Sequence, residues 1–321
     1  MNTGKAWLVT GGVGFIGYHV CRELLLRGDA ITIVDDFSDA PYPAAYKRRN
    51  AQDLTREFPG TSIVEASVTD RPGIAPFFEG KDGVLHLAGL AGVRPSIKDP
   101  ASYARVNVEG TANVLEISRR LGITRFVMAS SSSVYGNSTP LPAREEAPAI
   151  VPESPYAASK RSAELVADSV CRHEPEMSVA ALRFFTVYGA RQRPEMAITL
   201  FTRAILANRP ITIFGDGSMR RDFTHVADIA RGVLAALDAG RAGFRAYNLG
   251  SGAPITLSGL VEALAHATCH EPEVQRNAVP PGDVEATYAD IARAQAELGW
   301  TPRVPLREGL KDVVAWVRAH P

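Results

Sequence analysis

The sequence predicts an α/β fold in which a doubly wound parallel sheet precedes a smaller, mixed α/β domain at the C-terminal end. Three observations carry this prediction. Short β-rich runs alternate with helical segments through the first half of the chain, a glycine-rich turn joins the first run to the first helix, and the alternation loosens beyond about residue 186. The β-rich runs are AWLVT, AITIVD, TSIVEA, GVLHLA, RFVMAS and VAALRFF.

Helical periodicity between these runs predicts the helices that cover the sheet. The first spans residues 16–27 and stops at Gly28, a residue type that favours the end of a helix. Two further helices are expected over residues 101–121 and 156–173. Because helical segments separate the strands, the strands are expected to run parallel.

The change of pattern predicts two domains, residues 1–185 and residues 186–321. In the second part, loops with proline and glycine separate shorter elements. A helical stretch followed by AYNLG is typical of one more helix and strand, so we expect residues 222–252 to return to the first sheet.

The turn after the first strand is the most specific local signal. It reads TGGVGFIG and spaces Gly11, Gly14 and Gly17 between a strand and a helix. In that context, backbone N–H groups and the helix N-terminus hold a pyrophosphate, which predicts a Rossmann-type dinucleotide site. Asp35 and Asp36 end the second strand, where a carboxylate accepts hydrogen bonds from the adenosine ribose. Since an acid there repels a 2′-phosphate, NAD is predicted rather than NADP.

The stretch SPYAASK, residues 154–160, places a phenol and an ammonium one helical turn apart. Ser154 is a preferred N-cap and Pro155 favours the first helical position, so a helix is expected to begin here. Tyr156 and Lys160 then share one face of that helix. A cation and the positive end of a helix favour the phenolate, so we expect a lowered tyrosine pKa and a role as a base. The alternative is an ordinary surface pair.

Composition argues against several classes of function. Lysine plus arginine and aspartate plus glutamate balance at 35 each, so no global field favours nucleic acid or an anionic membrane. Cys21, Cys171 and Cys269 lack metal-ligand spacing and are expected to be buried thiols of a reducing compartment. The chain enters its first strand without a leader-like region and has no apolar run long enough to span a bilayer. We therefore expect a cytoplasmic protein without a metal site.

Several motifs together carry a resemblance to a known family. They are TGGVGFIG, HLAG, ASSSSVYG, YAASK, RRDFTHVAD, RFFTVYGARQRPEMA and GVRPS. On these motifs the chain resembles the extended short-chain dehydrogenase/reductase family (NAD-dependent epimerase/dehydratase family), and within it the nucleotide-sugar 4-epimerases. The last two motifs are similar to those of UDP-glucuronate 4-epimerases, whereas glucose-type enzymes typically carry Asn where this chain has Thr186.

The resemblance implies a role for each matching residue. Tyr156 is the base, Lys160 binds the cofactor ribose and tunes that tyrosine, and Ser131 hydrogen-bonds the sugar hydroxyl. The implied contacts to NAD are Gly11, Gly14, Phe15, Ile16, Gly17, Asp35, Asp36, Ser67, Val68, Leu87, Ala88, Gly89, Asn107, Tyr156 and Lys160. The implied contacts to the UDP-sugar are Arg94, Ser131, Ser132, Ser133, Tyr156, Thr186, Arg193, Arg221 and Asp283.

Different parts of the substrate fall to different residues in this resemblance. Arg193 and Arg221 are expected on the diphosphate or the nucleotide, with Asp283 on the uridine ribose. A group of hydroxyl side chains is expected on the C6 carboxylate of the sugar, although the two serines could instead cap backbone groups of their loop. These hydroxyl residues are Ser132, Ser133 and Thr186.

One departure from the family pattern concerns the adenine. Many family members place Asp where Ser67 stands in EASVTD, and that carboxylate holds the adenine amino group. The contact is therefore expected to pass to Ser67 or to the backbone at Val68.

The resemblance implies C4 epimerisation of UDP-glucuronate to UDP-galacturonate through a 4-keto intermediate, without decarboxylation. A 4-keto glucuronate is a β-keto acid, so the enzyme must suppress loss of carbon dioxide. Related dehydratases carry an Asp-Glu pair, and related decarboxylases a Glu, where this chain has Ser132 and Ser133. We expect neutral hydroxyls to hold the carboxylate near the ring plane, where its C–C bond overlaps poorly with the ketone π system.

Three alternatives stay open at this point. They are a UDP-glucose 4-epimerase, a UDP-glucuronate decarboxylase that yields a pentose, and a non-catalytic dinucleotide-binding sensor. The complete set of Ser131, Tyr156 and Lys160 favours an enzyme over a sensor. The resemblance also implies a homodimer, in which the helices over residues 101–121 and 156–173 pair with their copies.

Overall fold

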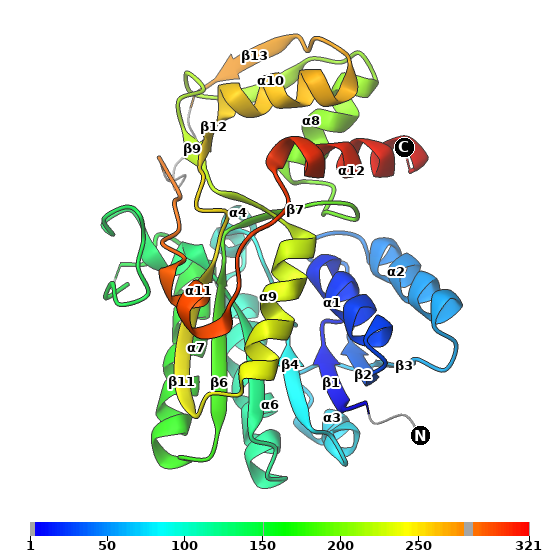
Figure 1. Ribbon diagram of the computed structural model, residues 1–321, viewed down its shortest axis with the longest axis vertical. Helices are drawn as coiled ribbons and strands as arrows, with labels where there is room; N and C mark the ends of the chain where they lie inside the picture. The colour runs from blue at the N-terminus through cyan, green and yellow to red at the C-terminus, as the bar shows by residue number, and fades with distance from the viewer. Residues whose placement is uncertain (1–3, 150, 279–284, 321) are drawn as a thin grey trace.

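A parallel sheet forms the centre of the molecule (Figure 1). The computed structural model describes residues 4–149, 151–278 and 285–320. Within these residues, seven strands pair in the order β11-β6-β5-β4-β1-β2-β3. The order reverses between β1 and β4, so the predicted doubly wound sheet is confirmed. The strands are β1 (Ala6–Thr10), β2 (Ala30–Asp35), β3 (Ser62–Glu65), β4 (Gly83–His86), β5 (Arg125–Ser131), β6 (Ser178–Phe184) and β11 (Gly243–Leu249).

Helices cover both faces of this sheet. Trp7 and Val9 of β1 lie in one hydrophobic cluster, whereas Leu8 between them lies in the other. Burial on both sides explains why the strands are almost continuously apolar in sequence. On the first face lie α1 (Phe15–Leu26) and α9 (Val226–Ala239), with α2 (Ala44–Glu57) beside α1. On the second lie α3 (Arg71–Ile74), η1 (Ala75–Phe78), α6 (Gly110–Arg120) and α7 (Pro155–His173).

A smaller unit stands at one end of the sheet (Figure 1). Its three long helices bury a separate hydrophobic cluster together with β8, which pairs with β13. Short strand pairs β10-β7 and β12-β9 complete it. The helices are α8 (Ala197–Leu206), α10 (Leu257–Thr268) and α12 (Leu306–Ala319). The strands are β7 (Thr186–Tyr188), β8 (Ile211–Phe214), β9 (Arg220–Arg221), β10 (Phe223–His225), β12 (Ile255–Thr256) and β13 (Val274–Asn277).

The chain passes repeatedly between the two units. β11 pairs in parallel with β6 and forms the edge of the sheet, after which the chain returns to α10. Beyond β13 it comes back once more through α11 (Ala292–Leu298). Trp300 then packs in the same cluster as Trp7 of β1. The domain boundary expected near residue 185 stays a prediction, since segments from both halves of the chain share one core.

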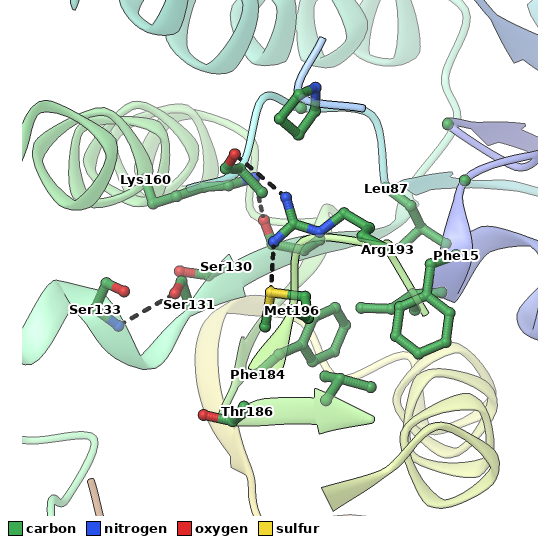
Figure 2. A pocket seen from close by; sticks show the side chains of 18 of the residues that line it. Phe15, Leu87, Ser130, Ser131, Ser133, Lys160, Phe184, Thr186, Arg193 and Met196 are labelled. Atoms are coloured by element: carbon green, nitrogen blue, oxygen red, sulfur yellow. Dashed lines mark hydrogen bonds between the residues drawn. The ribbon is translucent and has the colours of Figure 1, made fainter. Parts of the chain in front are cut away.

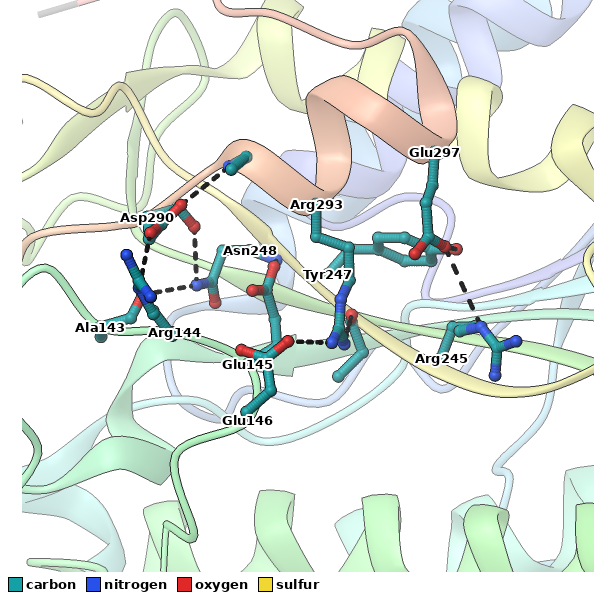
Figure 3. Close-up of polar contacts among 12 residues, drawn as sticks. Ala143, Arg144, Glu145, Glu146, Arg245, Tyr247, Asn248, Asp290, Arg293 and Glu297 are labelled. Carbon is teal, nitrogen blue, oxygen red and sulfur yellow. Dashed lines mark hydrogen bonds and ion pairs between the residues drawn. The ribbon is translucent and has the colours of Figure 1, made fainter.

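Figure 3 shows how the last of these crossings is held. The side-chain amide of Asn248 donates to the carbonyl oxygens of Ala143 and Asp290, at 2.9 and 3.0 Å. Arg293 forms an ion pair with Glu146. The segment that follows residue 285 is thereby fixed beside the edge of the sheet.

The prediction of a single helix over residues 101–121 is wrong in detail. The structure has α5 (Pro100–Ala104), a π-helical turn η2 (Arg105–Glu109) and α6 in its place, with α4 (Val93–Lys98) just before. The wide turn carries Asn107, whose buried side chain bonds a neighbouring loop. Such π turns occur often at functional sites.

The cysteines are only partly as expected. Cys21 and Cys171 are buried, but Cys269 is exposed. Cys269 ends α10 in a left-handed conformation with φ of +59°, where the chain turns at the surface. Within the described residues, every helix is too short or too polar to cross a membrane.

Candidate active site

The glycine-rich turn brings the backbone of β1 close to the start of α1. Gly11 has φ of +69°, and a Cβ there would lie 2.5 Å from the backbone nitrogen of Ala88. A Cβ on Gly17 would lie 2.1 Å from the carbonyl oxygen of Gly11. α1 starts after Gly14 with neither a side-chain cap nor an acidic residue in its first turn. Its first N–H groups are therefore available to an anion, which fits the pyrophosphate of NAD.

Two carboxylates lie at the adenosine end of the site, in a cavity of about 90 Å³. Asp35 is buried, and burial raises the pKa of its carboxyl while nearby Lys47 opposes the shift. Asp35 accepts the N–H of Phe37 at 3.1 Å. Asp36 is exposed and accepts the N–H of Ser38 at 3.0 Å. Both retain oxygens that fit the hydroxyls of a ribose, as NAD requires.

The two residues expected near the adenine differ in position. The hydroxyl of Ser67 lies 2.9 Å from that of Thr69, and Ser67 is not among the residues that line the cavity. Val68 and Ala88 do line it. Of the two expected replacements for the missing Asp, Val68 lines this cavity and Ser67 does not, and the adenine contact itself stays a prediction.

The three predicted catalytic residues meet in a central cavity of about 290 Å³. Ser131 ends β5, and Lys160 reaches the same space from α7 (Figure 2). α7 begins as predicted, because Ser154 accepts the N–H of Ala157 at 3.2 Å and a proline follows it. Tyr156 is in the first turn of that helix. Other predicted cofactor contacts in this cavity are Gly11, Gly14, Phe15, Ile16, Gly17, Leu87 and Gly89.

Successive turns of α7 bond to the end of β5. Tyr156 lies close enough to Ser131, at the end of the strand, for that hydroxyl to oppose the rise in the pKa of the phenol. One turn further, Lys160 Nζ donates to the carbonyl oxygen of Ala129 at 2.9 Å. The strand and the helix therefore fix the phenol and the ammonium relative to each other.

A buried ion pair continues this arrangement on the next turn. Glu164 accepts from Ser130 Oγ at 2.6 Å and lies 2.8 Å from Arg183 of β6. The side chains of both ions are almost inaccessible, at 0% and 3%. Burial lowers the pKa of Lys160, and the negative charge of Glu164 opposes that shift in part.

The expected lowering of the Tyr156 pKa is wrong for the chain by itself. Burial raises the pKa of the phenol, and the hydrogen bond from Ser131 and the charge of Arg193 oppose that shift only in part. Burial also lowers the pKa of Lys160, to about 8. Desolvation disfavours the charged form of each group, and it outweighs the helix and charge effects considered from sequence.

Asn107 and Gly89 shape the loop that faces the catalytic helix. The Asn107 carboxamide pairs with both backbone groups of Leu90, at 2.8 and 2.9 Å, and donates to Ser159 at 2.9 Å. A Cβ on Gly89 would lie 2.9 Å from Lys160 Nζ. Asn107 therefore acts on the cofactor site through this loop and does not line the cavities described above.

A second cavity of about 200 Å³ adjoins the central one. Both are lined by Ser132, Ser133 and Thr186, the three residues predicted for the sugar carboxylate, and by Phe185. Ser132 and Ser133 begin the turn η3 (Ser132–Tyr135), and the N–H of Ser133 donates to Ser131 Oγ at 3.1 Å. Three residues with hydroxyl side chains therefore lie where the two cavities meet.

The predicted cationic residues take different positions. Arg193 lines the central cavity (Figure 2), and Arg221 lines the second. Arg94 is exposed, with its guanidinium carbon 5.1 Å from the ring centre of Phe214, and it lines neither cavity. Asp283 lies outside the described residues.

Sequence reasoning missed several residues of the site. Tyr42 lines both the central and the adenosine cavity, and burial raises the pKa of its phenol to about 12. Met196 lies 3.2 Å from a guanidinium nitrogen of Arg193. The pattern RQRPEMA could have indicated Met196, whereas no motif marks Tyr42 in the loop after β2.

A glycine-rich turn, acids at the end of β2, and a tyrosine–lysine pair on α7 define a Rossmann-type, dinucleotide-dependent enzyme of the short-chain dehydrogenase type. Residues 7–250 match the sequence profile described as the NAD dependent epimerase/dehydratase family. The chain belongs to this family.

Individual relatives are similar over almost the whole chain. A UDP-glucuronate 4-epimerase of Thermodesulfobacterium geofontis is 37% identical, over 98% of this chain and 96% of its own. The crystal structure of a UDP-glucuronic acid 4-epimerase from Bacillus cereus, in complex with UDP-glucuronic acid and NAD, has a TM-score of 0.90 at 32% identity. That of a Thermotoga maritima UDP-glucose 4-epimerase with UDP-glucose has a TM-score of 0.89 at 32% identity. Each structural match covers 98% of this chain and 99% of the other.

Proposed function

We propose that this chain converts UDP-glucuronate to UDP-galacturonate by NAD-dependent epimerisation at C4, without decarboxylation. The observation that carries the proposal is the wall of hydroxyl groups beside the catalytic cavity, formed by Ser132, Ser133 and Thr186. The names of the UDP-glucuronate 4-epimerases to which the chain is similar support the same substrate.

The catalytic work of the chain is proton transfer and positioning. In its phenolate form Tyr156 takes the proton of the C4 hydroxyl, and Ser131, next to that phenol, orients the hydroxyl. Burial disfavours the phenolate in the chain by itself, and the positive charge of the nicotinamide in bound NAD would favour it. Bound NAD supplies the reversible hydride acceptor, and the glycine turn and Asp35 hold it. After the ring has turned, Tyr156 returns its proton to the carbonyl oxygen of the 4-keto sugar and C4 regains its hydrogen on the opposite face, so the configuration at C4 is inverted.

To retain the C6 carboxylate of the sugar, the site must hold that group in place without an acid that could protonate a leaving group. Among the described residues that line the central cavity there is no carboxylate. In the second cavity, Glu153 accepts the N–H of Asn137 at 3.2 Å and serves its own loop. Hydroxyl donors can hold a carboxylate without supplying a proton to a leaving group, which favours epimerisation over dehydration or decarboxylation.

Two alternative functions are enzymatic reactions that the same fold could catalyse. A UDP-glucose 4-epimerase would invert UDP-glucose, and a decarboxylase would release a UDP-pentose from UDP-glucuronate. NMR of products formed from each sugar separates all three outcomes. We expect UDP-galacturonate from UDP-glucuronate and slow or no turnover of UDP-glucose.

A tyrosine variant tests the mechanism. Tyr156→Phe removes the proton acceptor and keeps the ring, so we expect turnover to fall by about 10²–10⁴-fold. Bound NAD, measured by absorbance after denaturation, should be unchanged. A variant that still epimerises at the native rate contradicts the base assignment.

The arrangement of the whole protein is part of the same proposal. We propose a first domain over residues 1–185 joined by residues 222–252, a second over the remainder from residue 186, and a cytoplasmic location. Two copies pair through α6 and α7, for which Leu165 of α7, 52% exposed, offers apolar surface. Light scattering that gives the mass of one chain contradicts the dimer.

A further inference from the structure

The loop over residues 189–193 presents its two arginines to opposite sides. Arg193 lines the central cavity, whereas Arg191 contacts the helices outside it. Just before Arg191, the carbonyl oxygen of Ala190 lies 3.0 Å from His19 Nε2 of α1. The loop is therefore attached to α1 through Ala190, and its last residue, Arg193, lines the central cavity.

Arg191 is held on every side. Its guanidinium carbon lies 3.9 Å from the ring centre of Tyr18 on α1 and 4.5 Å from that of Trp316 on α12. Its Nη2 lies 2.7 Å from the carboxylate of Asp53 on α2, and its side chain is only 11% exposed. The backbone of Arg191 has φ of +68°, a conformation that a residue with a side chain keeps only where its surroundings impose it.

Asn50 of α2 connects this arginine to the dinucleotide site. Its carboxamide oxygen accepts from Arg191 Nη1 at 2.7 Å. Its carboxamide nitrogen donates to the carbonyl oxygen of Val13 at 2.9 Å, and Val13 lies within the glycine-rich turn. Asn50 is 4% exposed, so both bonds are shielded from water. One buried side chain thus joins the phosphate-binding turn to the loop that carries Arg193.

We propose that Asn50 and Arg191 form a strut that fixes Arg193 relative to the glycine-rich turn and makes the binding of NAD and of the UDP moiety mutually favourable. The inference rests on the proposed function only in assuming that the substrate carries UDP, and it does not depend on which sugar is attached. A bound dinucleotide would hold the glycine-rich turn through Gly11 and Gly14, which line both cofactor cavities, and the turn holds Asn50 through Val13. Asn50 in turn holds Arg191. The loop then meets the diphosphate already in position, and linkage requires that UDP strengthen NAD binding by the same factor.

Calorimetric titration of NAD into the full chain freed of dinucleotide, with and without saturating UDP, tests the strut. In the native protein we expect UDP to lower the Kd of NAD about fivefold or more. Asn50→Asp keeps an acceptor for Arg191 but loses the donor to Val13. We expect this variant to bind UDP alone as the native chain does, with its NAD affinity no longer sensitive to UDP.

Variants of the arginine test the other half. Arg191→Met should weaken UDP binding and remove the coupling. Arg191→Lys keeps the charge but not the planar fork between two rings, so we expect it to behave like the methionine variant. Arg22→Met is the matched control, because Arg22 also joins α1 to α2, through Glu57 at 2.7 Å, without touching the loop.

The outcomes separate the strut from the proposed function. Native coupling in Asn50→Asp or in both arginine variants overturns the strut, and so does a native chain that binds UDP and NAD independently. A native chain that does not bind UDP contradicts the proposed function as well. If Arg191→Met fails to fold, Asn50→Asp and Arg191→Lys carry the test.

Discussion

At the scale of single residues, burial against β5 acts on Tyr156 and Lys160 in opposite directions. It raises the pKa of the phenol and lowers that of the ammonium, so each group favours its neutral form. Burial therefore shifts both pKa values away from their ordinary values, the phenol upward and the ammonium downward. The charge of Glu164 opposes this for the ammonium, whose pKa of about 8 leaves Lys160 mostly charged at neutral pH.

The lowered pKa of Lys160 predicts a pH-dependent stability. Below about pH 8 the folded and unfolded chains both carry the ammonium, and the folded chain bears the cost of burying it. Between about 8 and 10.5 the folded chain has released this proton while the unfolded chain holds it, so the free energy of unfolding rises with pH. The full effect is about 3 kcal/mol.

Comparison with Lys160→Met isolates this contribution, because all other groups titrate in both proteins. Relative to the variant, the native chain freed of dinucleotide should gain about 1–3 kcal/mol of unfolding free energy from pH 7 to pH 10. Urea denaturation at the two pH values measures the difference. A difference that does not change with pH contradicts the burial of a titrating ammonium.

Thr186 permits a test of how the carboxylate is retained. A hydrogen bond to a charged group is worth about 1.5–3 kcal/mol, so Thr186→Ala should raise the fraction of pentose by-product about tenfold or more. NMR of the products gives this fraction directly. Thr186→Ser keeps the hydroxyl and is the control. An unchanged ratio in the alanine variant counts against the hydroxyl wall.

The residues of the site differ in how far sequence could indicate them. Gly11 and Tyr156 belong to local motifs whose strand–turn–helix and helix-cap contexts can be recognised directly. Tyr42 reaches the cofactor cavities from a loop without a motif. The direction of the Tyr156 pKa was predicted wrongly because burial depends on neighbours distant in sequence, which no i,i+4 spacing reveals.

At the scale of elements, local chemistry again separates success from failure. The start of α7 was predicted, since Ser154 and Pro155 are sufficient to start a helix. The π turn η2 was not, because it brings Asn107 to Leu90 and Ser159, two contacts made across the fold. Periodicity over residues 101–121 records the helical character but not the wider turn.

The ion pair between Glu164 and Arg183 joins α7 to β6 one helical turn beyond Lys160. Removing one partner leaves a buried charge uncompensated, so Arg183→Met should lower the free energy of unfolding by about 3–5 kcal/mol. Glu164→Gln should also destabilise. The double variant should lose about 1–3 kcal/mol less than the sum, since the second change removes the orphaned charge. Additive losses in chemical denaturation contradict a direct coupling.

At the scale of the whole molecule, the alternation of strands and helices predicts the sheet but not the closing of the fold. The register of β11 on β6 and the position of Trp300 depend on contacts between parts of the chain separated by many residues. The indole nitrogen of Trp300 donates to the carbonyl oxygen of Asp228 on α9 at 2.8 Å. A Cβ on Gly232 of α9 would lie 3.1 Å from that nitrogen. The absence of a side chain at Gly232 therefore leaves room for the indole against the helix.

Because the chain crosses between the units, we expect them to unfold together. Calorimetry of the native protein should give one transition, with the calorimetric enthalpy equal to the van't Hoff enthalpy. Trp300 is 3% exposed, so Trp300→Ala should cost about 3–5 kcal/mol and lower the midpoint without splitting the transition. Leu26→Ala, at a side chain that is 54% exposed, is the control and should change stability by less than about 0.5 kcal/mol. Two resolved transitions, only one of which moves in Trp300→Ala, would mean that the last crossing joins the units without making them one cooperative structure.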